Sequence, residues 1–182
     1  DGIITKYIYN NKNNTLTSAR TGTQITTYAY DANGNMLSKK DAAGTTAVEY
    51  GFKNMVKKIT IPSKGINAFN YDGDGKRIEK VDSAGTTQYY FEGSNVVAEK
   101  NVGNITMYTI GEKIISRKVN GQKQYYLYDS IGDTVAITDN NGGILQKYSY
   151  EAFGKVRPIK YPPYIETGNK QQFVGGLGVQ KD

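Results

Sequence analysis

A short aromatic motif recurs along the chain and limits the folds open to it more than any other feature does. The motif is an aromatic residue, any residue, Tyr, an acid, two further residues and Gly. Its four clear copies span residues 28–34, 69–75, 126–132 and 148–154. Recurrence at this scale predicts an array of small structural units instead of one irregular domain.

The spacing of the copies gives the size of the unit. Tyr30 and Tyr71 are 41 residues apart, and a weaker copy, Tyr50–Asn54, lies midway between them. Polar and apolar residues alternate along the chain, and Gly, Asn and Asp interrupt the alternation every eight to twelve residues. This pattern predicts units of about 20 residues, each made of two short antiparallel strands and two turns.

Two classes of turn are predicted. In the first, the acid after the Tyr accepts backbone N–H groups and the Gly adopts a positive φ; its residues are Asp31 with Gly34, Asp72 with Gly75, Asp129 with Gly132, and Gly154 in the last copy. The second lies at the opposite end of the hairpins, at residues 41–44, 82–85 and 139–142. Asn120-Gly121 is a strong signal for a two-residue hairpin.

The two aromatic residues of each motif are separated by one residue, which places both rings on one face of a strand. The pairs are Tyr28 and Tyr30, Phe69 and Tyr71, Tyr126 and Tyr128, and Tyr148 and Tyr150. In stacked hairpins these rings form ladders across the sheet. Cross-strand aromatic pairs contribute about 0.2–1 kcal/mol each, so we expect the rings to hold adjacent hairpins together.

The composition argues against most catalytic chemistry. The chain has 16 Tyr but no Cys and no His, which removes disulfides, thiolate metal sites and histidine acid–base chemistry. Segments 31–35 and 72–76 resemble calcium loops, but Ala42 and Ser83 stand where a bidentate Glu is required. We therefore expect turns there, and we predict no enzyme activity, catalytic residue, metal site or cofactor.

Charge and hydropathy exclude two further classes of partner. The net charge of +6 is dispersed along the chain and does not favour a nucleic-acid partner. No apolar run approaches the roughly 18 residues that a membrane span requires. Because motif-like residues already begin at Tyr7, we expect the chain to be a fragment of a longer protein.

The pattern changes near residue 155. Three of the four prolines lie within residues 158–163, and a Gly-rich segment follows at 172–179. Pro interrupts sheet ladders. We therefore expect a hairpin array over residues 1–155 and a Pro/Gly-rich connector with a truncated final strand over residues 156–182.

These residues resemble the RHS/YD-repeat family. The likeness is strongest over Tyr125–Gly154 and includes Phe173-Val174-Gly175-Gly176. Members of that family include polymorphic toxins, wall-associated proteins and teneurins, and their hairpins coil into a β-shell. In the bacterial toxins this shell encloses a variable C-terminal toxin. An aspartate-based self-cleavage frees the toxin in bacterial members. The resemblance implies that the cleavage segment and the toxin lie beyond residue 182.

We therefore expect an all-β array of antiparallel hairpins in a twisted or curled sheet, forming a structural shell segment of a secreted or cell-surface protein. Its partners would be the remainder of the shell and the enclosed cargo. The alternative is an adhesion or carbohydrate-binding module whose Tyr and Lys residues contact cell-wall or host glycan. Unpaired strand edges predict edge-to-edge self-association.

Overall fold

The structure is a computed structural model that describes residues 4–151, 154–157, 168–170 and 172. It is all-β, as the alternation predicts: fifteen antiparallel strands form one sheet, and a three-residue 3₁₀ helix follows the fifth strand. The strands are β1 (Thr5–Tyr9), β2 (Leu16–Thr21), β3 (Gln24–Tyr30), β4 (Met36–Asp41), β5 (Gly44–Tyr50), β6 (Val56–Ile61), β7 (Gly65–Tyr71), β8 (Arg77–Asp82), β9 (Gly85–Glu92), β10 (Asn95–Asn101), β11 (Asn104–Ile110), β12 (Ile114–Val119), β13 (Gln122–Tyr128), β14 (Thr134–Thr138) and β15 (Ile144–Lys147).

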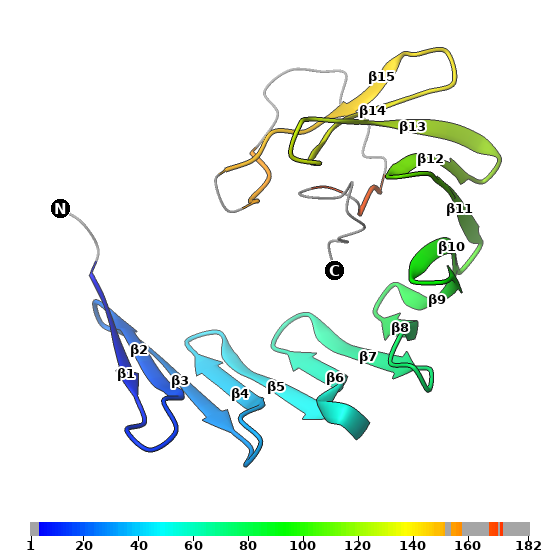
Figure 1. Cartoon of the computed structure of the whole chain (residues 1–182). Helices are drawn as coiled ribbons and strands as arrows, with labels where there is room; N and C mark the ends of the chain where they lie inside the picture. Colours follow the sequence, from blue (N-terminus) through cyan, green and yellow to red (C-terminus); the bar gives the residue numbers. More distant parts are fainter. Residues whose placement is uncertain (1–3, 152–153, 158–167, 171, 173–182) are drawn as a thin grey trace. The chain divides into compact units, whose positions relative to one another are not determined.

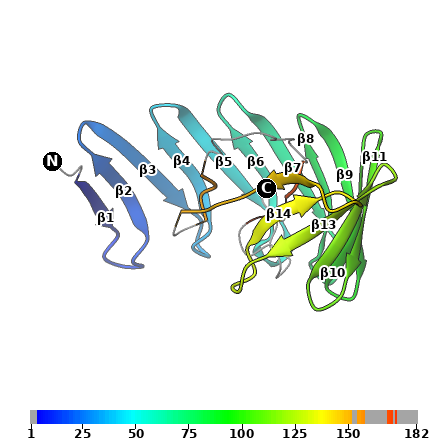
Figure 2. The ribbon, with the colours of Figure 1, turned by 90° about the horizontal axis from the view of Figure 1, so that it is seen from above.

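Each strand pairs with the strands before and after it in the chain, so the sheet order is the sequence order (Figure 1). The chain divides into two compact units, Asp1–Gln88 and Tyr89–Asp182, which are described separately below. In the first unit, successive strands from β1 to β7 lie side by side (Figure 2). None of the described helical residues forms a helix long and apolar enough to cross a membrane.

The turn after each motif Tyr has one recurring geometry. At residues 31–35 the Asp31 carboxylate accepts the N–H groups of Asn33 and Asn35, at 2.9 and 2.8 Å. The N–H of Gly34, at φ +84°, donates to the Asp31 carbonyl. The following strand carries one extra residue, so the register shifts between Ala29 and Tyr30. This is the predicted turn with a bulge.

The same backbone hydrogen bonds close the turns at Asp72, Asp129 and Glu151. They also close the turn at Asp139, which the sequence pattern had assigned to the second class. The Asp139 carboxylate accepts the N–H groups of Asn141 and Gly143, and the register shifts between Ile137 and Thr138. That assignment was wrong because an Asp and a Gly three residues apart occur in both turn classes, so the spacing alone does not separate them.

Turns of the second class are shorter. Asp41 pairs with Gly44 and Asp82 pairs with Gly85. Val119 pairs with Gln122 across Asn120-Gly121, whose φ angles of +47° and +87° match the predicted two-residue hairpin.

The two faces of the sheet differ in composition. The face that carries the motif aromatic residues is called the tyrosine face, and the other is called the reverse face. In the second unit, Ile114, Tyr126, Ile137 and Tyr148 form a buried cluster on the tyrosine face. In the first unit, Val48 and Phe69 are the buried apolar residues of this face. The large buried side chains therefore form an aromatic and aliphatic layer on the tyrosine face, whereas the residues buried on the reverse face of the second unit are small, as at Ser116 and Ala136.

The turn geometry gives a test at Gly75, which lies at φ +89° with the Met55 sulfur 3.4 Å from where a Cβ would be. We expect Gly75→Val to lower the free energy of unfolding by about 1–2 kcal/mol because a left-handed backbone crowds a Cβ atom. Gly73, in the same turn, has open space around it and no positive φ. Gly73→Val is therefore the matched control, and equal urea midpoints for the two variants would reject the assignment.

Candidate functional site

In four copies of the motif, counting the weaker copy at Tyr50, the second aromatic Tyr connects its hairpin to the strand before it. Its hydroxyl donates a hydrogen bond to a backbone carbonyl at the start of that strand. The bonds run from Tyr50 to Met36 (3.1 Å), Tyr71 to Val56 (2.9 Å), Tyr128 to Ile114 (2.9 Å) and Tyr150 to Thr134 (2.7 Å). The accepting residue each time opens the strand that follows a bulged turn. The hydroxyl therefore joins neighbouring repeat units.

The rings of the predicted pairs lie together on the tyrosine face. Tyr126 and Tyr128 stack with centroids 6.0 Å apart, and Tyr148 and Tyr150 stack at 6.3 Å. Tyr28 and Tyr30 are half-buried on the same face. Phe69 is buried, and the Arg77 guanidinium lies 5.3 Å from the centre of its ring. Of the predicted turn residues, Gly34, Gly75, Gly132 and Gly154 all have positive φ.

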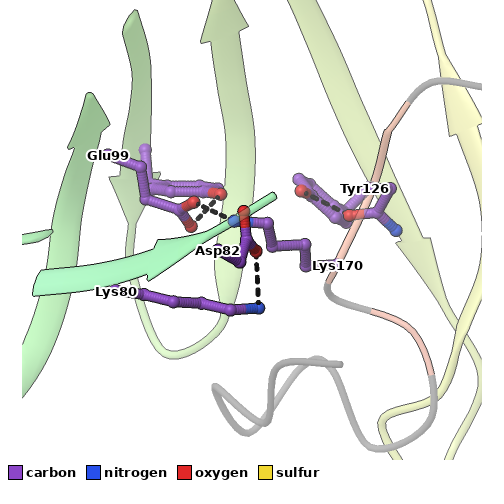
Figure 3. Close-up of polar contacts among 7 residues, drawn as sticks. Lys80, Asp82, Glu99, Tyr126 and Lys170 are labelled. Atoms are coloured by element: carbon purple, nitrogen blue, oxygen red, sulfur yellow. Dashed lines mark hydrogen bonds and ion pairs between the residues drawn. The ribbon is translucent and has the colours of Figure 1, made fainter. Parts of the chain in front are cut away.

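A buried polar cluster on the tyrosine face of the second unit is the most distinctive candidate site. The Glu99 side chain is only 8% exposed, and its carboxylate accepts the Tyr108 hydroxyl at 2.8 Å. Lys170, from the segment after the last strand, donates to the same carboxylate at 2.7 Å. Figure 3 shows the Lys170 side chain reaching Glu99. Its ammonium also lies 5.8 Å from the centre of the Tyr89 ring.

The neighbouring residues of this segment also bind the sheet. Asn169 is buried, and its side-chain oxygen accepts the Tyr126 hydroxyl at 2.9 Å (Figure 3). The Gln172 carbonyl accepts the Thr134 N–H at 3.0 Å. Hydrogen bonds and an ion pair therefore hold Asn169, Lys170 and Gln172 against strands β13, β10 and β14. This group of contacts is called the segment anchor.

Burial sets the protonation of the phenols around the anchor. It raises the pKa of Tyr108 far above the usual value, and the neighbouring Glu99 carboxylate adds to the effect. Burial also raises the pKa of Tyr126, while the Arg117 cation opposes the change. Arg117 is itself buried and donates from Nε to Gln124 at 2.9 Å. Both phenols keep their protons at neutral pH, so they serve as hydrogen-bond donors.

The anchor has the chemistry of attachment. Its carboxylate is occupied by a phenol and an ammonium, and its phenols are held as donors. Across the described ranges, no group of three or more Asp and Glu residues gathers to hold a metal ion. The anchor thus positions a chain segment.

Sequence reasoning missed the anchor. The partners are 71 residues apart for Lys170 and Glu99 and 43 apart for Asn169 and Tyr126, so no local spacing links them. One signal was available. In the strand alternation, Glu99 falls on the buried face, where an unpaired carboxylate is costly and implies a partner. The Pro-rich residues 158–164 and the final strand expected at 173–179 lie outside the described residues.

Comparisons with known proteins agree with this geometry. A family model described as RHS Repeat matches residues 9–46. A tRNA3(Ser)-specific nuclease, WapA, from Bacillus spizizenii is 31% identical over 200 residues, which cover 96% of this chain. The chain belongs to the RHS-repeat family. The resemblance carried by the motif residues is therefore confirmed.

A solved structure has the same fold. A crystal structure of TcdB2-TccC3 without its hypervariable C-terminal region matches 84% of this chain with a TM-score of 0.50 and 13% identity. Another of TcdB2-TccC3 matches the same share with a TM-score of 0.49 and 12% identity. The chain spans only 8% of the WapA relative and 10% of these crystallised chains. It corresponds to a small part of each larger protein.

The buried phenols predict a loss of stability in alkali. Burial raises the pKa of Tyr128 to about 12 and also raises that of Tyr150. An unfolded chain releases phenol protons from about pH 10, whereas the folded chain retains them. The unfolded state is then favoured, so the free energy of unfolding should fall as the pH rises from about 10 to 12.

Melting temperatures measured between pH 9 and 11.5 test this. Tyr128→Phe should flatten the decline and, by removing the bond to Ile114, lower stability at pH 7 by about 0.5–1.5 kcal/mol. Tyr7→Phe, at a ring 58% exposed, is the control and should do neither. A decline of the same slope in Tyr128→Phe and the parent would contradict the assignment.

The segment anchor predicts protection of Lys170 from trypsin. Glu99→Gln removes the ion pair, so cleavage after Lys170 should accelerate at least about tenfold, because a charge-assisted hydrogen bond contributes roughly 1.5–3 kcal/mol. The matched control is Glu49→Gln. Glu49 binds Lys58 at the same 2.7 Å but is 57% exposed, so its pair contributes little. Equal cleavage rates after Lys170 in the two variants would show that the ion pair does not hold the segment.

Proposed function

We propose that this chain is a wall segment of an RHS-type shell, in which the tyrosine face contacts an enclosed chain segment. In this proposal the sheet itself is not catalytic. The segment anchor supports this most directly. It is a set of buried contacts through which the sheet holds a part of the chain that follows it. A wall that must retain a downstream segment needs such contacts on one face.

The chemistry of the tyrosine face is consistent with this role. In the first unit, Lys39 pairs with Asp41 at 2.9 Å and Lys80 pairs with Asp82 at 3.3 Å, the latter drawn in Figure 3. These strand lysines therefore have their charge balanced by a neighbouring acid. A lining of Tyr rings with balanced charges offers apolar contact without attracting one sign of charge, which suits the enclosure of varied sequences.

The repeat geometry supports a structural role as well. Each connecting Tyr hydroxyl donates to a backbone carbonyl, and the motif carboxylates accept turn N–H groups. Groups used in this way are committed to holding the fold. The Tyr rings that an adhesion module would need for glycan stacking are packed against each other, as at Tyr126 and Tyr128. This favours the wall role over the glycan-binding alternative.

A protease-protection assay on the longer protein that contains this chain tests the proposal. With the wall intact, the region after residue 182 should resist a non-specific protease. Glu99→Gln combined with Asn169→Ala should expose it, while Glu49→Gln should not. Rapid digestion of that region in the unsubstituted protein would overturn the enclosure role.

The non-catalytic part of the proposal has its own test, prompted by the nuclease name of the WapA relative. The 182-residue chain, incubated with total tRNA and Mg²⁺, should leave the tRNA intact. If the chain cleaves tRNA when present in less than equimolar amount, and this activity persists through a second purification step, the segment carries activity.

A further inference from the structure

The reverse face of the second unit carries a band of lysines with no strand acid beside it. Lys100, Lys118, Lys123 and Lys147 are exposed on strands β10, β12, β13 and β15. Successive side chains of a strand point to opposite faces, and directly paired residues share a face. The strand pairing therefore places all four lysines on the reverse face. Within β10–β15, no Asp or Glu lies on this face, because Glu99 belongs to the other one.

The register arranges these lysines along a diagonal. Lys118 and Lys123 are directly opposite each other, and the row continues through Met107 to Ala98. Lys100 lies two residues from Ala98 along β10, which is one row of this face to one side. Lys147 is level with Leu127, four residues from Lys123, which is two rows to the other side. With strands about 4.8 Å apart and residues about 3.4 Å apart along each strand, the band spans roughly 30 Å.

Such a band is unfavourable for the isolated fold. Like charges directly opposite each other in a sheet are destabilising, and Lys118 and Lys123 are such a pair. The first unit shows the ordinary solution on its own reverse face, where Glu49 is opposite Lys58 and binds it at 2.7 Å. The contrast shows that the sheet can pair its strand charges, and that within β10–β15 none of the four lysines has an acidic residue opposite it.

Exposed apolar side chains flank the band. Ile105, Met107 and Leu127 are 51%, 56% and 46% exposed. Apolar groups gathered on an exposed face and bordered by charge mark an interaction surface. Tyr125 is the one aromatic residue on the reverse face of β10–β15; it is half-buried, and the Lys123 ammonium lies 5.1 Å from the centre of its ring. Within β10–β15 this face therefore offers cations and aliphatic groups, and the one exposed ring near it is Tyr90 on the adjacent strand β9, which is 48% exposed.

We propose that this lysine band, Lys100, Lys118, Lys123 and Lys147, binds a linear phosphodiester polymer that lacks bases, of the poly(alditol phosphate) type. A diagonal of point charges fits a chain that carries phosphates at regular intervals, since lysine ammonium groups bind phosphate as point charges. The aliphatic residues contact the carbon backbone between phosphates. Single-stranded RNA fits less well because its binding relies on successive aromatic platforms as well as charge, and within β9–β15 Tyr90 is the one exposed ring on this face. The proposal is independent of the shell role.

Binding of the full chain to synthetic poly(glycerol phosphate), measured by isothermal titration calorimetry over a salt series, tests the proposal. With about four phosphates neutralised, affinity should fall about fifty-fold between 50 and 200 mM salt. Lys118→Gln with Lys123→Gln should weaken binding at 50 mM salt at least about tenfold and reduce the salt slope by about half. Its melting temperature should equal or exceed that of the parent, which separates lost binding from lost folding.

The control variant is Lys6→Gln with Lys40→Gln, which makes the same change in net charge on exposed lysines of the first unit. It should bind as the parent does. Equal losses in the two double variants would show attraction by net charge alone and overturn the site. Equal or tighter binding of a single-stranded RNA of matched phosphate number would overturn the assignment to a polymer without bases.

Discussion

The hydrogen bond from a motif Tyr to the carbonyl that opens the preceding strand is the contact on which this array depends. A single two-stranded hairpin is marginally stable in water, and each unit here has only about 20 residues. The Tyr bond and the strand ladder are shared between neighbours, and in the second unit the buried cluster joins side chains from neighbouring strands. Stability in such an array comes from the interfaces between repeats as well as from the repeats themselves.

The bulged turn and the Tyr hydrogen bond act on the same strand. The turn places an extra residue in the following strand, which shifts the register there, and the hydroxyl of the next Tyr reaches the first carbonyl of that same strand. The Asp supplies the turn acceptor and the Gly supplies the positive φ. One seven-residue motif thus specifies the turn, the register and the connection to the neighbouring unit, which explains why these residue types recur together.

The fold could be predicted from the sequence because its determinants are local. The alternation, the Asp and Gly turn positions and the ring spacing each lie within a few residues, and the family resemblance added the arrangement of hairpins. The segment anchor could not be predicted in this way. Lys170 and Glu99 are 71 residues apart and are brought together only by the six strands from β10 to β15, and no local pattern encodes that contact. The turn at Asp139 shows the same limit, since its class depends on strand register and not on its residue types.

Hydrogen exchange in Tyr71→Phe tests the central claim, which is that the Tyr hydrogen bond makes the stability of each unit depend on its neighbour. The substitution removes the hydroxyl that binds the Val56 carbonyl. Amide protection should fall in β6 and β7 and decline with distance along the sheet, while β13 to β15 keep their protection. Equal loss of protection in every strand, or no loss in β6 and β7, would contradict the account.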